Sequence, residues 1–381
     1  MLKLPIYWGI CLFFILAGCK KDNLLEPTKE VMTDNPRITD LDKLVDNTFK
    51  DYAAKTNTAG FSIALIKGTQ VNQYHYGETK LGNNSLPNSQ TLYEIGSITK
   101  TFTSAALIYW LNQNNININS SVKSYLPTNL SSNLTKNGVD VSFKHLLNHT
   151  SGMPRIPNDL PNSLDPYLNY DSIKVYNYIK NHSLLRIPGT FPTTEQEAFD
   201  FYSNLAYSLA GLILERQNHN TLESIFRSII FAPLNMNNST LNDIETINNR
   251  AYPHNSTNNA LYWHISGTAG AGGIKSCLAD MIKYAQAQIN ASNTNMLGES
   301  FLENQIPQIQ INGKDYFGLG WEFYFTKSNK RITVKDGGTG GFTAFIAFEK
   351  TSQKAIVALF NNHNSNNPSE PFINLLEEYF K

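Results

Sequence analysis

Residues 94–107 read EIGSITKTFTSAAL, which places Ser97 three residues before Lys100 at the start of an apolar run that continues through Trp110. Because three residues make about one helical turn, both side chains lie on one face if a helix begins here. A serine hydroxyl is a weak nucleophile and needs a neighbouring base before it attacks a carbonyl. Ser97 is therefore a candidate nucleophile, with Lys100 as its proton partner.

The same spacing also has a purely structural interpretation. Serine is a common N-cap, and taken alone the stretch favours this use of Ser97. A second Ser-x-x-Lys occurs at Ser120 and Lys123, where no apolar helix follows and a loop is expected. Other parts of the chain have to decide between the two interpretations.

A second stretch, FDFYSNLAYSLAGLIL, carries Tyr202 and Asn204 immediately before a helix with leucines at helical spacing. Taken alone, Tyr202 is about equally well explained as a buried aromatic residue bonded through its hydroxyl. The spacing is not specific, since Tyr167 and Asn169 repeat it.

A third stretch, VKDGGTGGFTAFIAFE, ends a strand at Lys335 and surrounds Thr339 with four glycines. Glycines beside a strand end allow another backbone or a ligand to approach closely. A lysine at a strand end is ordinarily solvated, so Lys335 by itself indicates little.

Taken together and in this order, the three stretches resemble the motifs of the serine β-lactamase and penicillin-binding protein superfamily, in its class C β-lactamase and D-Ala-D-Ala carboxypeptidase branch. The matching residues are Ser97-x-x-Lys100, Tyr202-Ser203-Asn204 and Lys335-Asp336-Gly337. LLNHTSGMP at 146–154, YFGLGW at 316–321 and GTGGF at 338–342 also look like that branch, so the resemblance covers residues 39–381.

The resemblance implies an acyl-enzyme mechanism without a cofactor. Ser97 attacks an amide, lactam or ester carbonyl, and water later releases the acyl group. Tyr202 is the candidate general base, since two ammonium groups, Lys100 and Lys335, favour its phenolate. Lys100 is the competing base, and the sequence does not choose between them.

The resemblance also implies which residues bind the substrate. Asn204 orients a substrate amide, and the backbone N–H groups of Ser97 and Gly338 form the oxyanion hole. The remaining substrate-binding candidates follow one another along the third stretch: Lys335, Asp336, Gly337, Gly338 and Thr339. Asp336 departs from the family, which usually carries a threonine there that helps to hold a carboxylate, so weak activity on carboxylate-bearing substrates is expected.

The implied fold is α/β, of the β-lactamase/transpeptidase type, with a cleft that holds Ser97. The residue pattern agrees with it, because two strand-like runs near the start, GFSIALIKG and QVNQYHYG, and several near the end predict one antiparallel sheet built from both chain ends and flanked by helices. The apolar run AIVALF predicts a central strand covered on both faces. A mostly helical region, about 110–265, is expected to be inserted in the catalytic domain at 39–381.

The chain begins with a segment that predicts export. Residues 1–18 form a short apolar stretch, too short for a spanning helix, and end in Leu16-Ala17-Gly18 before Cys19. The ending resembles a bacterial lipoprotein processing site, with Cys19 as the lipid-modified residue and 19–38 as a tether. The alternative is a plain secretory signal with an incidental cysteine. The expected location is the bacterial cell envelope, lipid-anchored in the outer membrane or facing the periplasm.

Composition limits the partners. Lys plus Arg and Asp plus Glu both number 31 in 381 residues, so the chain has no basic footprint for nucleic acid. A small-molecule or peptide substrate and a monomer are expected.

His145 and His149 have the spacing of zinc ligands, but no third ligand is evident, so no metal is expected. The resemblance implies a structural histidine instead. Cys277 is expected to be a buried small side chain.

Three functions remain open from the sequence. The leading one is a lipid-anchored serine hydrolase that acts on D-Ala-type peptides or β-lactams in the cell envelope. The second is an esterase or D-amino-acid amidase. The third is a penicillin-binding module that is acylated without turnover.

Overall fold

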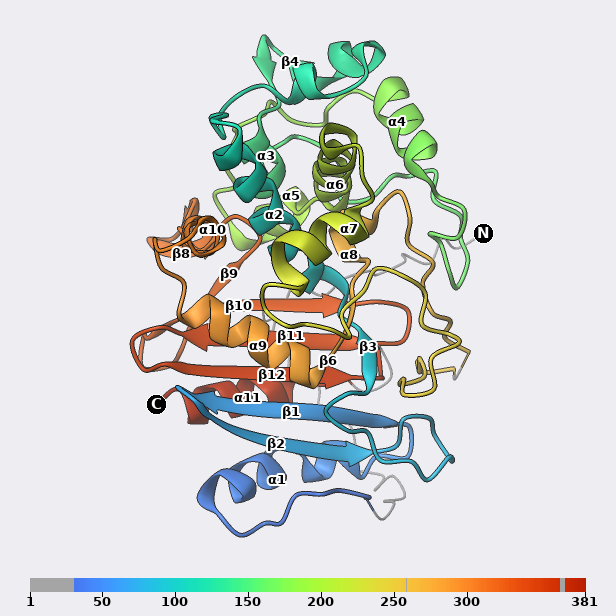
Figure 1. Ribbon diagram of the computed structural model, residues 1–381, viewed down its shortest axis with the longest axis vertical. Coiled ribbons are helices and arrows are strands. Elements are labelled where there is room, and N and C mark those ends of the chain that lie inside the picture. Colours follow the sequence, from blue (N-terminus) through green and yellow to red (C-terminus); the bar gives the residue numbers. More distant parts are fainter. Residues whose placement is uncertain (1–30, 258, 364–366) are drawn as a thin grey trace.

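The computed structural model describes residues 31–257, 259–363 and 367–381, and its centre is one antiparallel sheet with helices on both faces (Figure 1). The strand order is β2-β1-β12-β11-β10-β9-β8-β7. The bounds of its strands are β1 Gly60–Lys67, β2 Gln70–Gly77, β7 Ile309–Ile311, β8 Lys314–Phe317, β9 Glu322–Phe325, β10 Arg331–Gly338, β11 Thr343–Glu349 and β12 Lys354–Phe360. The sheet from both chain ends is thus confirmed.

The first two strands, which correspond to the two strand-like runs near the start of the chain, form a hairpin. Lys67 pairs with Gln70, so a two-residue turn joins β1 to β2. Gly68 has φ +59 in this turn, a conformation that glycine adopts without steric cost. A substitution at Gly68 is therefore expected to strain the turn.

β12 is the central strand predicted from its unbroken apolar run. It lies between β1 and β11, and its side chains alternate between two cores. Ala355, Val357 and Leu359 belong to the larger core on the side of the helical region. The intervening side chains, Ile356, Ala358 and Phe360, belong to a second core.

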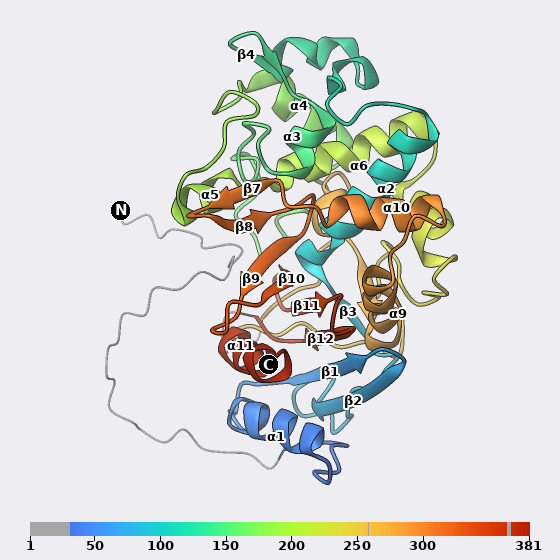
Figure 2. The same cartoon turned by 90° about the vertical axis from the view of Figure 1, so that its left-hand side faces the viewer.

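The second core lies under two helices from opposite ends of the chain, α1 (Asp40–Ala53) and α11 (Ser369–Tyr379), while α9 (Leu278–Ile289) covers the other face (Figure 2). Phe49 of α1 packs against Phe360 with its ring tilted and the centroids 5.9 Å apart, and Phe372 of α11 stacks on Phe345 with ring centroids 4.3 Å apart. These aromatic contacts fasten both terminal helices to the same face of the sheet.

A helical region stands above the sheet in Figure 1. Its centre is α2 (Thr99–Gln113), which is buried on nearly every side from Thr99 to Leu111, as expected for a core helix. The other helices are α3 Phe143–Leu147, α4 Ser172–Asn181, α5 Glu195–Phe201, α6 Asn204–Asn218, α7 Leu222–Phe226, α8 Ala269–Gly272 and α10 Met296–Asn304, with the short turns η1 Gly96–Ile98, η2 Val122–Tyr125, η3 Thr128–Leu134 and η4 Arg227–Phe231.

Two small strand pairs complete the described elements. β4 (Thr135–Lys136) pairs with β5 (Val139–Asp140) at the far end of the helical region. β3 (Leu92–Glu94) pairs with β6 (Lys275–Cys277), which brings the segment before Ser97 beside the segment before α9. Cys277 is fully buried, as expected, and burial raises the pKa of its thiol to about 12.

The expected tether is wrong in its last residues. Thr33 bridges to Tyr76 of β2, and the Asn35 side chain is buried and donates to the Tyr76 hydroxyl and to the Asp42 carbonyl. These contacts make residues 33–35 part of the folded domain.

The expected signal peptide at 1–18 and the lipidation site at Cys19 lie outside the described residues. Within the described part of the chain, no helix has the length and apolar character to cross a membrane.

Candidate active site

Ser97 and Lys100 meet at the start of α2. Lys100 Nζ donates to Ser97 Oγ at 3.0 Å and to the Ala271 carbonyl at 2.6 Å. Lys100 is fully buried, whereas Ser97 is partly exposed. The N-cap interpretation of Ser97 is wrong, because the cap positions of η1 and α2 are Ile95 and Ile98, without a side-chain cap bond.

The second Ser-x-x-Lys lies elsewhere and is used differently. Lys123 Nζ binds Asp140 Oδ1 and Thr135 Oγ1, each at 3.0 Å, at the edge of the helical region. Ser121, not Ser120, caps the short turn η2. This pair therefore belongs to the surface structure around β4 and β5.

Tyr202 lies in the turn between α5 and α6, surrounded by cations. Its ring centroid is 5.0 Å from Lys100 Nζ, 5.0 Å from Lys335 Nζ and 4.7 Å from the Arg155 guanidinium carbon. Only 2% of Tyr202 is exposed. Three cationic side chains thus face the ring of a buried tyrosine.

His149 contacts both Tyr202 and the backbone of the turn that carries it. The resemblance implies a structural histidine here but does not say what it binds. Its ring stacks on Tyr202 with centroids 4.3 Å apart, and its Nδ1 accepts the backbone N–H of Ser203 at 3.0 Å. Burial, followed by the charges of Lys100, Lys335 and Arg155, holds the pKa of His149 well below its ordinary value. His149 is therefore a neutral acceptor.

His145 and His149, which have the sequence spacing of zinc ligands, each bind a backbone N–H instead. His145 Nδ1 accepts the backbone N–H of Ser142, which completes the cap of α3. Among the residues that the structure describes, no group of three or more His, Cys, Asp or Glu side chains could hold a metal ion.

Asn204 is the first residue of α6 and points a free acceptor into the site. Its backbone N–H donates to the Arg155 carbonyl at 2.8 Å, while its buried Oδ1 has no hydrogen-bond partner. A buried polar atom without a partner is costly unless a ligand or water satisfies it. Asn204 Oδ1 is thus suited to accept a substrate N–H.

Lys335 is buried in an ion pair that the sequence did not reveal. Its Nζ lies 2.5 Å from Glu322 Oε1 of β9 and 3.4 Å from Asp336 Oδ1. Burial raises the pKa of Glu322, and Lys335 opposes that effect. The one available signal was a glutamate inside the otherwise apolar run WEFYF, since a buried charge requires a partner.

The backbone of β10 comes into van der Waals contact with the Ser97 turn. β9 pairs with β10 only from Arg331 to Val334, so the end of β10 is open on that edge. A Cβ on Gly337 would lie 2.8 Å from the Ser97 nitrogen, and one on Gly96 would lie 2.6 Å from the Gly338 nitrogen. The two backbone segments that carry the Ser97 and Gly338 N–H groups are therefore in close contact.

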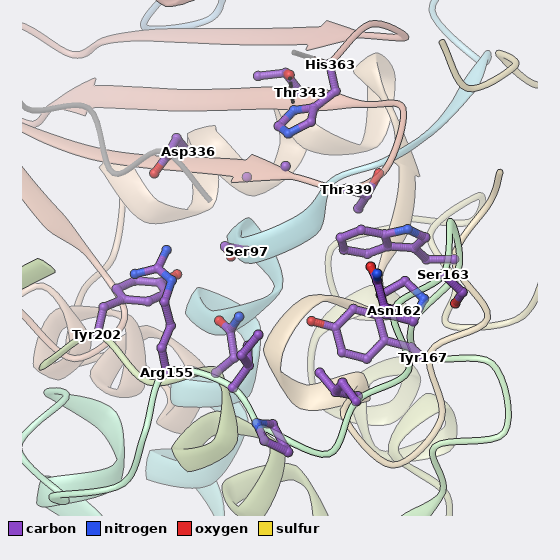
Figure 3. Close-up of a pocket in the computed structure, with 18 of the residues that line it drawn as sticks. Ser97, Arg155, Asn162, Ser163, Tyr167, Tyr202, Asp336, Thr339, Thr343 and His363 are labelled. Atoms are coloured by element: carbon purple, nitrogen blue, oxygen red, sulfur yellow. Dashed lines mark hydrogen bonds between the residues drawn. The ribbon is translucent and has the colours of Figure 1, made fainter. Parts of the chain in front are cut away.

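These parts line one cavity of about 360 Å³ (Figure 3). Of the residues predicted from the sequence, it brings together Ser97, Tyr202, Asn204, Asp336, Gly337, Gly338 and Thr339. Lys100 and Lys335 do not line it and lie buried behind its wall. Figure 3 shows Tyr202, Arg155 and Asp336 on one side of Ser97, and Thr339, Tyr167 and Asn162 on the other.

Sequence reasoning missed three groups of the cavity wall. Arg155 and His363 line it directly, and Trp263 packs on Tyr167 with ring centroids 5.0 Å apart at the other end. Each comes from a loop without periodicity, so only the tertiary structure brings them to Ser97. Gly340 makes room for the indole, because a Cβ there would lie 2.7 Å from Trp263 Nε1.

Glu94 is a further buried acid beneath the cavity. Its Oε1 accepts the backbone N–H of Trp263 at 2.8 Å, and the Thr339 hydroxyl lies near its carboxyl group. Burial raises the pKa of Glu94 to about 7, against the opposing charge of Lys275. This side chain links the segment before Ser97 to the loop that ends β10.

Comparison with known proteins identifies relatives over nearly the whole chain. A family model described as Beta-lactamase matches residues 45–375. The chain is 26% identical over 326 residues to the D-alanyl-D-alanine-carboxypeptidase/endopeptidase AmpH of Escherichia coli (strain K12), covering 81% of this chain and 79% of that protein. It is 24% identical over 359 residues to a beta-lactamase of Yersinia enterocolitica, covering 85% and 87%.

Solved structures confirm the fold. A beta-lactamase/D-alanine carboxypeptidase from Yersinia pestis superposes with a TM-score of 0.74 at 24% identity, covering 90% of this chain and 100% of that one. The corresponding protein from Pseudomonas syringae gives a TM-score of 0.74 at 23% identity, covering 90% and 99%.

Proposed function

The chain belongs to the beta-lactamase family, and on that premise we propose that this serine hydrolase acts on D-alanyl peptides or β-lactams in the bacterial cell envelope. Relatives at 26% and 24% identity are named a D-alanyl-D-alanine-carboxypeptidase/endopeptidase and a beta-lactamase. Their names support both substrate classes.

One observation carries the assignment of the nucleophile. Lys100 Nζ lies 3.0 Å from Ser97 Oγ, and Ser97 is the exposed member of this pair at the cavity. A nucleophile and its proton partner within hydrogen-bond reach at a cavity wall are the minimum geometry for covalent catalysis.

The acylation step follows from the positions of the neighbouring groups. Ser97 Oγ passes its proton to Tyr202 and forms a bond to the substrate carbonyl carbon, and the N–H groups of Ser97 and Gly338 bind the oxyanion. The bond to the leaving atom then breaks, and that atom takes the proton from Tyr202. Lys100 is the alternative base, although its two hydrogen bonds to Ser97 Oγ and the Ala271 carbonyl suit a donor.

Deacylation repeats these steps with water as the nucleophile. Water gives a proton to the same base and attacks the acyl carbonyl, and Ser97 Oγ leaves with that proton. Asn204 Oδ1, which lacks a protein partner, would hold an N–H of the acyl group throughout.

The Asp336 carboxylate favours the second candidate function, an esterase or amidase for substrates without a carboxylate. It lines the cavity beside Lys335, where it would oppose an anionic substrate group. The attraction that Lys335 could offer such a group is already shared with Glu322.

The proposed location rests on sequence alone. Leu16 to Cys19 reads as a lipoprotein processing site, so the mature enzyme would be held at the membrane through lipid on Cys19. The substrate would then meet the enzyme in the cell envelope.

Trapping the acyl-enzyme tests the proposed function. Intact-mass spectrometry after incubation with a penicillin, and separately with a neutral ester, is expected to show an adduct that maps to Ser97. Ser97→Ala should abolish it, whereas Ser120→Ala, in the matched Ser-x-x-Lys on the surface, should retain it.

An adduct that persists in Ser97→Ala would refute the nucleophile. A penicillin adduct that forms stoichiometrically but is never released, with no turnover of peptide or ester, would instead identify a penicillin-binding module.

A further inference from the structure

The cavity extends beyond Ser97 to the opposite face of the sheet. On β10, Lys335 and Gly337 face the helical region, so Asp336 and Gly338 face α11. Their partners on β11 are Phe345 and Thr343, which share that face. Asp336, Thr343 and His363 all line the cavity, and we call these three residues the α11-side wall.

The hydrogen bonds of His363 determine what this wall presents. The Thr343 hydroxyl donates its only hydrogen to the Asn362 carbonyl at 2.9 Å. Its 3.1 Å contact with His363 Nδ1 therefore requires the ring to donate from Nδ1. The tautomer leaves the lone pair on Nε2 as an acceptor.

His363 is neutral at physiological pH in this position. Only 8% of the residue is exposed, and burial lowers its pKa to about 4 while the nearby Asp336 carboxylate opposes that shift. The missing side chain at Gly338 accommodates the ring, because a Cβ there would lie 2.9 Å from its Cε1. The imidazole thus acts as a fixed, uncharged acceptor.

Asp336 adds a charged acceptor to the same wall. Its side chain is 23% exposed, and its Oδ1 touches Lys335 Nζ at 3.4 Å, a long contact for an ion pair. Lys335 makes the shorter bond, 2.5 Å, to Glu322. The wall therefore presents a carboxylate and a lone pair, whose complement is a positively charged hydrogen-bond donor.

The chemistry decides which part of a substrate meets this wall. The base that takes the Ser97 proton must return it to the leaving atom, so the leaving group departs toward Tyr202. Figure 3 shows Tyr202 and Asp336 on the same side of Ser97, with Tyr167 and Asn162 on the other. Tyr202 and Asp336 line the same cavity, so a leaving part that extends past Tyr202 can reach Asp336.

From this arrangement we propose that Asp336 and His363 form a subsite for an ammonium group on the leaving part of the substrate. The proposal rests on the proposed function, since it needs Ser97 to be the nucleophile. It narrows the substrate class to amides or esters whose leaving group carries an amine.

Three esters that share N-acetyl-D-alanine as the acyl group test the subsite. Their leaving alcohols are similar rings that differ in charge: 4-hydroxypiperidine, tetrahydropyran-4-ol and 4-hydroxycyclohexanecarboxylate. Release of N-acetyl-D-alanine at pH 7 gives kcat/KM for each. The full-length protein is expected to prefer the piperidine ester over the neutral ester by about 10-fold or more, the usual worth of a charge-assisted hydrogen bond, and to hydrolyse the carboxylate ester slowest.

Variants then assign the preference to the two residues. Asp336→Asn should reduce the piperidine-to-tetrahydropyran ratio about 10-fold whatever its absolute rates, and His363→Leu should reduce it in the same direction. The matched control is Asp51→Asn, which removes an exposed carboxylate on α1 and should keep the wild-type ratio.

Each remaining outcome overturns a distinct claim. If Ser97-dependent hydrolysis shows no preference for the piperidine ester, the subsite is refuted and the proposed function stands. If the carboxylate ester is hydrolysed fastest, Arg155 binds the leaving group's carboxylate and the ammonium subsite is refuted. If no ester is hydrolysed in a Ser97-dependent way, the proposed function fails and the subsite fails with it.

Discussion

Lys335 and Glu322 form a buried ion pair, with Nζ and Oε1 2.5 Å apart, directly behind the wall that carries Ser97. Truncating one partner of such a pair leaves an uncompensated buried charge, so its partners are not interchangeable. The Glu322 carboxylate interacts electrostatically with Lys335 and, more weakly, with Lys100. It therefore reduces the field that both lysines exert on Tyr202.

Tyr202→Phe is expected to lower the rate of acyl transfer by about 100-fold or more, the usual contribution of a positioned general base. The phenol lies 5.0 Å, measured from its ring centroid, from each of two lysines. Single-turnover acylation by a neutral ester measures the effect. Tyr167→Phe, in the other Tyr-x-Asn, is the control and should change the rate far less. Near-normal acylation by Tyr202→Phe would transfer the role to Lys100.

His149→Phe should reduce both stability and activity. Phenylalanine keeps a ring against Tyr202 but removes the Nδ1 acceptor, which leaves the buried N–H of Ser203 without a bond and costs about 1–3 kcal/mol. The freed turn should misplace Tyr202. Urea unfolding and kcat measure the two effects. A variant with normal stability and normal kcat would show that the Ser203 bond does not position the turn.

Sequence patterns predict most of the fold because burial on the sheet leaves a clear signal. The apolar run of β12 and the hairpin turn at Gly68 both reflect local chemistry. The sequence places residues 33–35 in the tether, because no local signal reveals that Asn35 bonds to Tyr76, a residue far along the chain.

The site was predictable only in part, for a related reason. Ser97, Tyr202 and Lys335 lie in motifs that family resemblance finds, and the structure brings them within a few side chains of one another. Glu322 and His363 are in no such motif. Their importance arises from the register of β9 against β10 and from the path of the chain after β12, which are tertiary properties.

Glu94→Gln should change how stability depends on pH. Burial raises the pKa of Glu94 from 4.5 to about 7, so between these values the folded protein keeps a proton that the unfolded chain loses. This contribution to stability is complete below pH 4.5 and is lost as pH rises through 7, at a cost of roughly 3 kcal/mol. The variant should remove that decline. Urea unfolding at pH 5 and pH 7.5 measures the decline in the free energy of unfolding. An equal decline in the wild-type protein and in Glu94→Gln would contradict the raised pKa.

Cys19→Ala should prevent lipid attachment. Because Leu16 to Cys19 reads as a processing site, we expect the wild-type protein to partition into detergent. The variant is expected to retain its signal segment or to leave the membrane fraction. Detergent phase separation and intact mass decide the matter. Identical mass and partitioning for the two proteins would reject the lipoprotein interpretation.

The pairing of β1 with β12 has a consequence for how the protein is made. Phe61 lies opposite Phe360, so β1, which pairs early with β2, obtains its second partner only after almost the entire polypeptide has been synthesised. Pairings between segments so distant in the chain form slowly, and until then the unpaired edge of β1 is open to aggregation. A nascent chain therefore cannot close this sheet while the ribosome is still extending it.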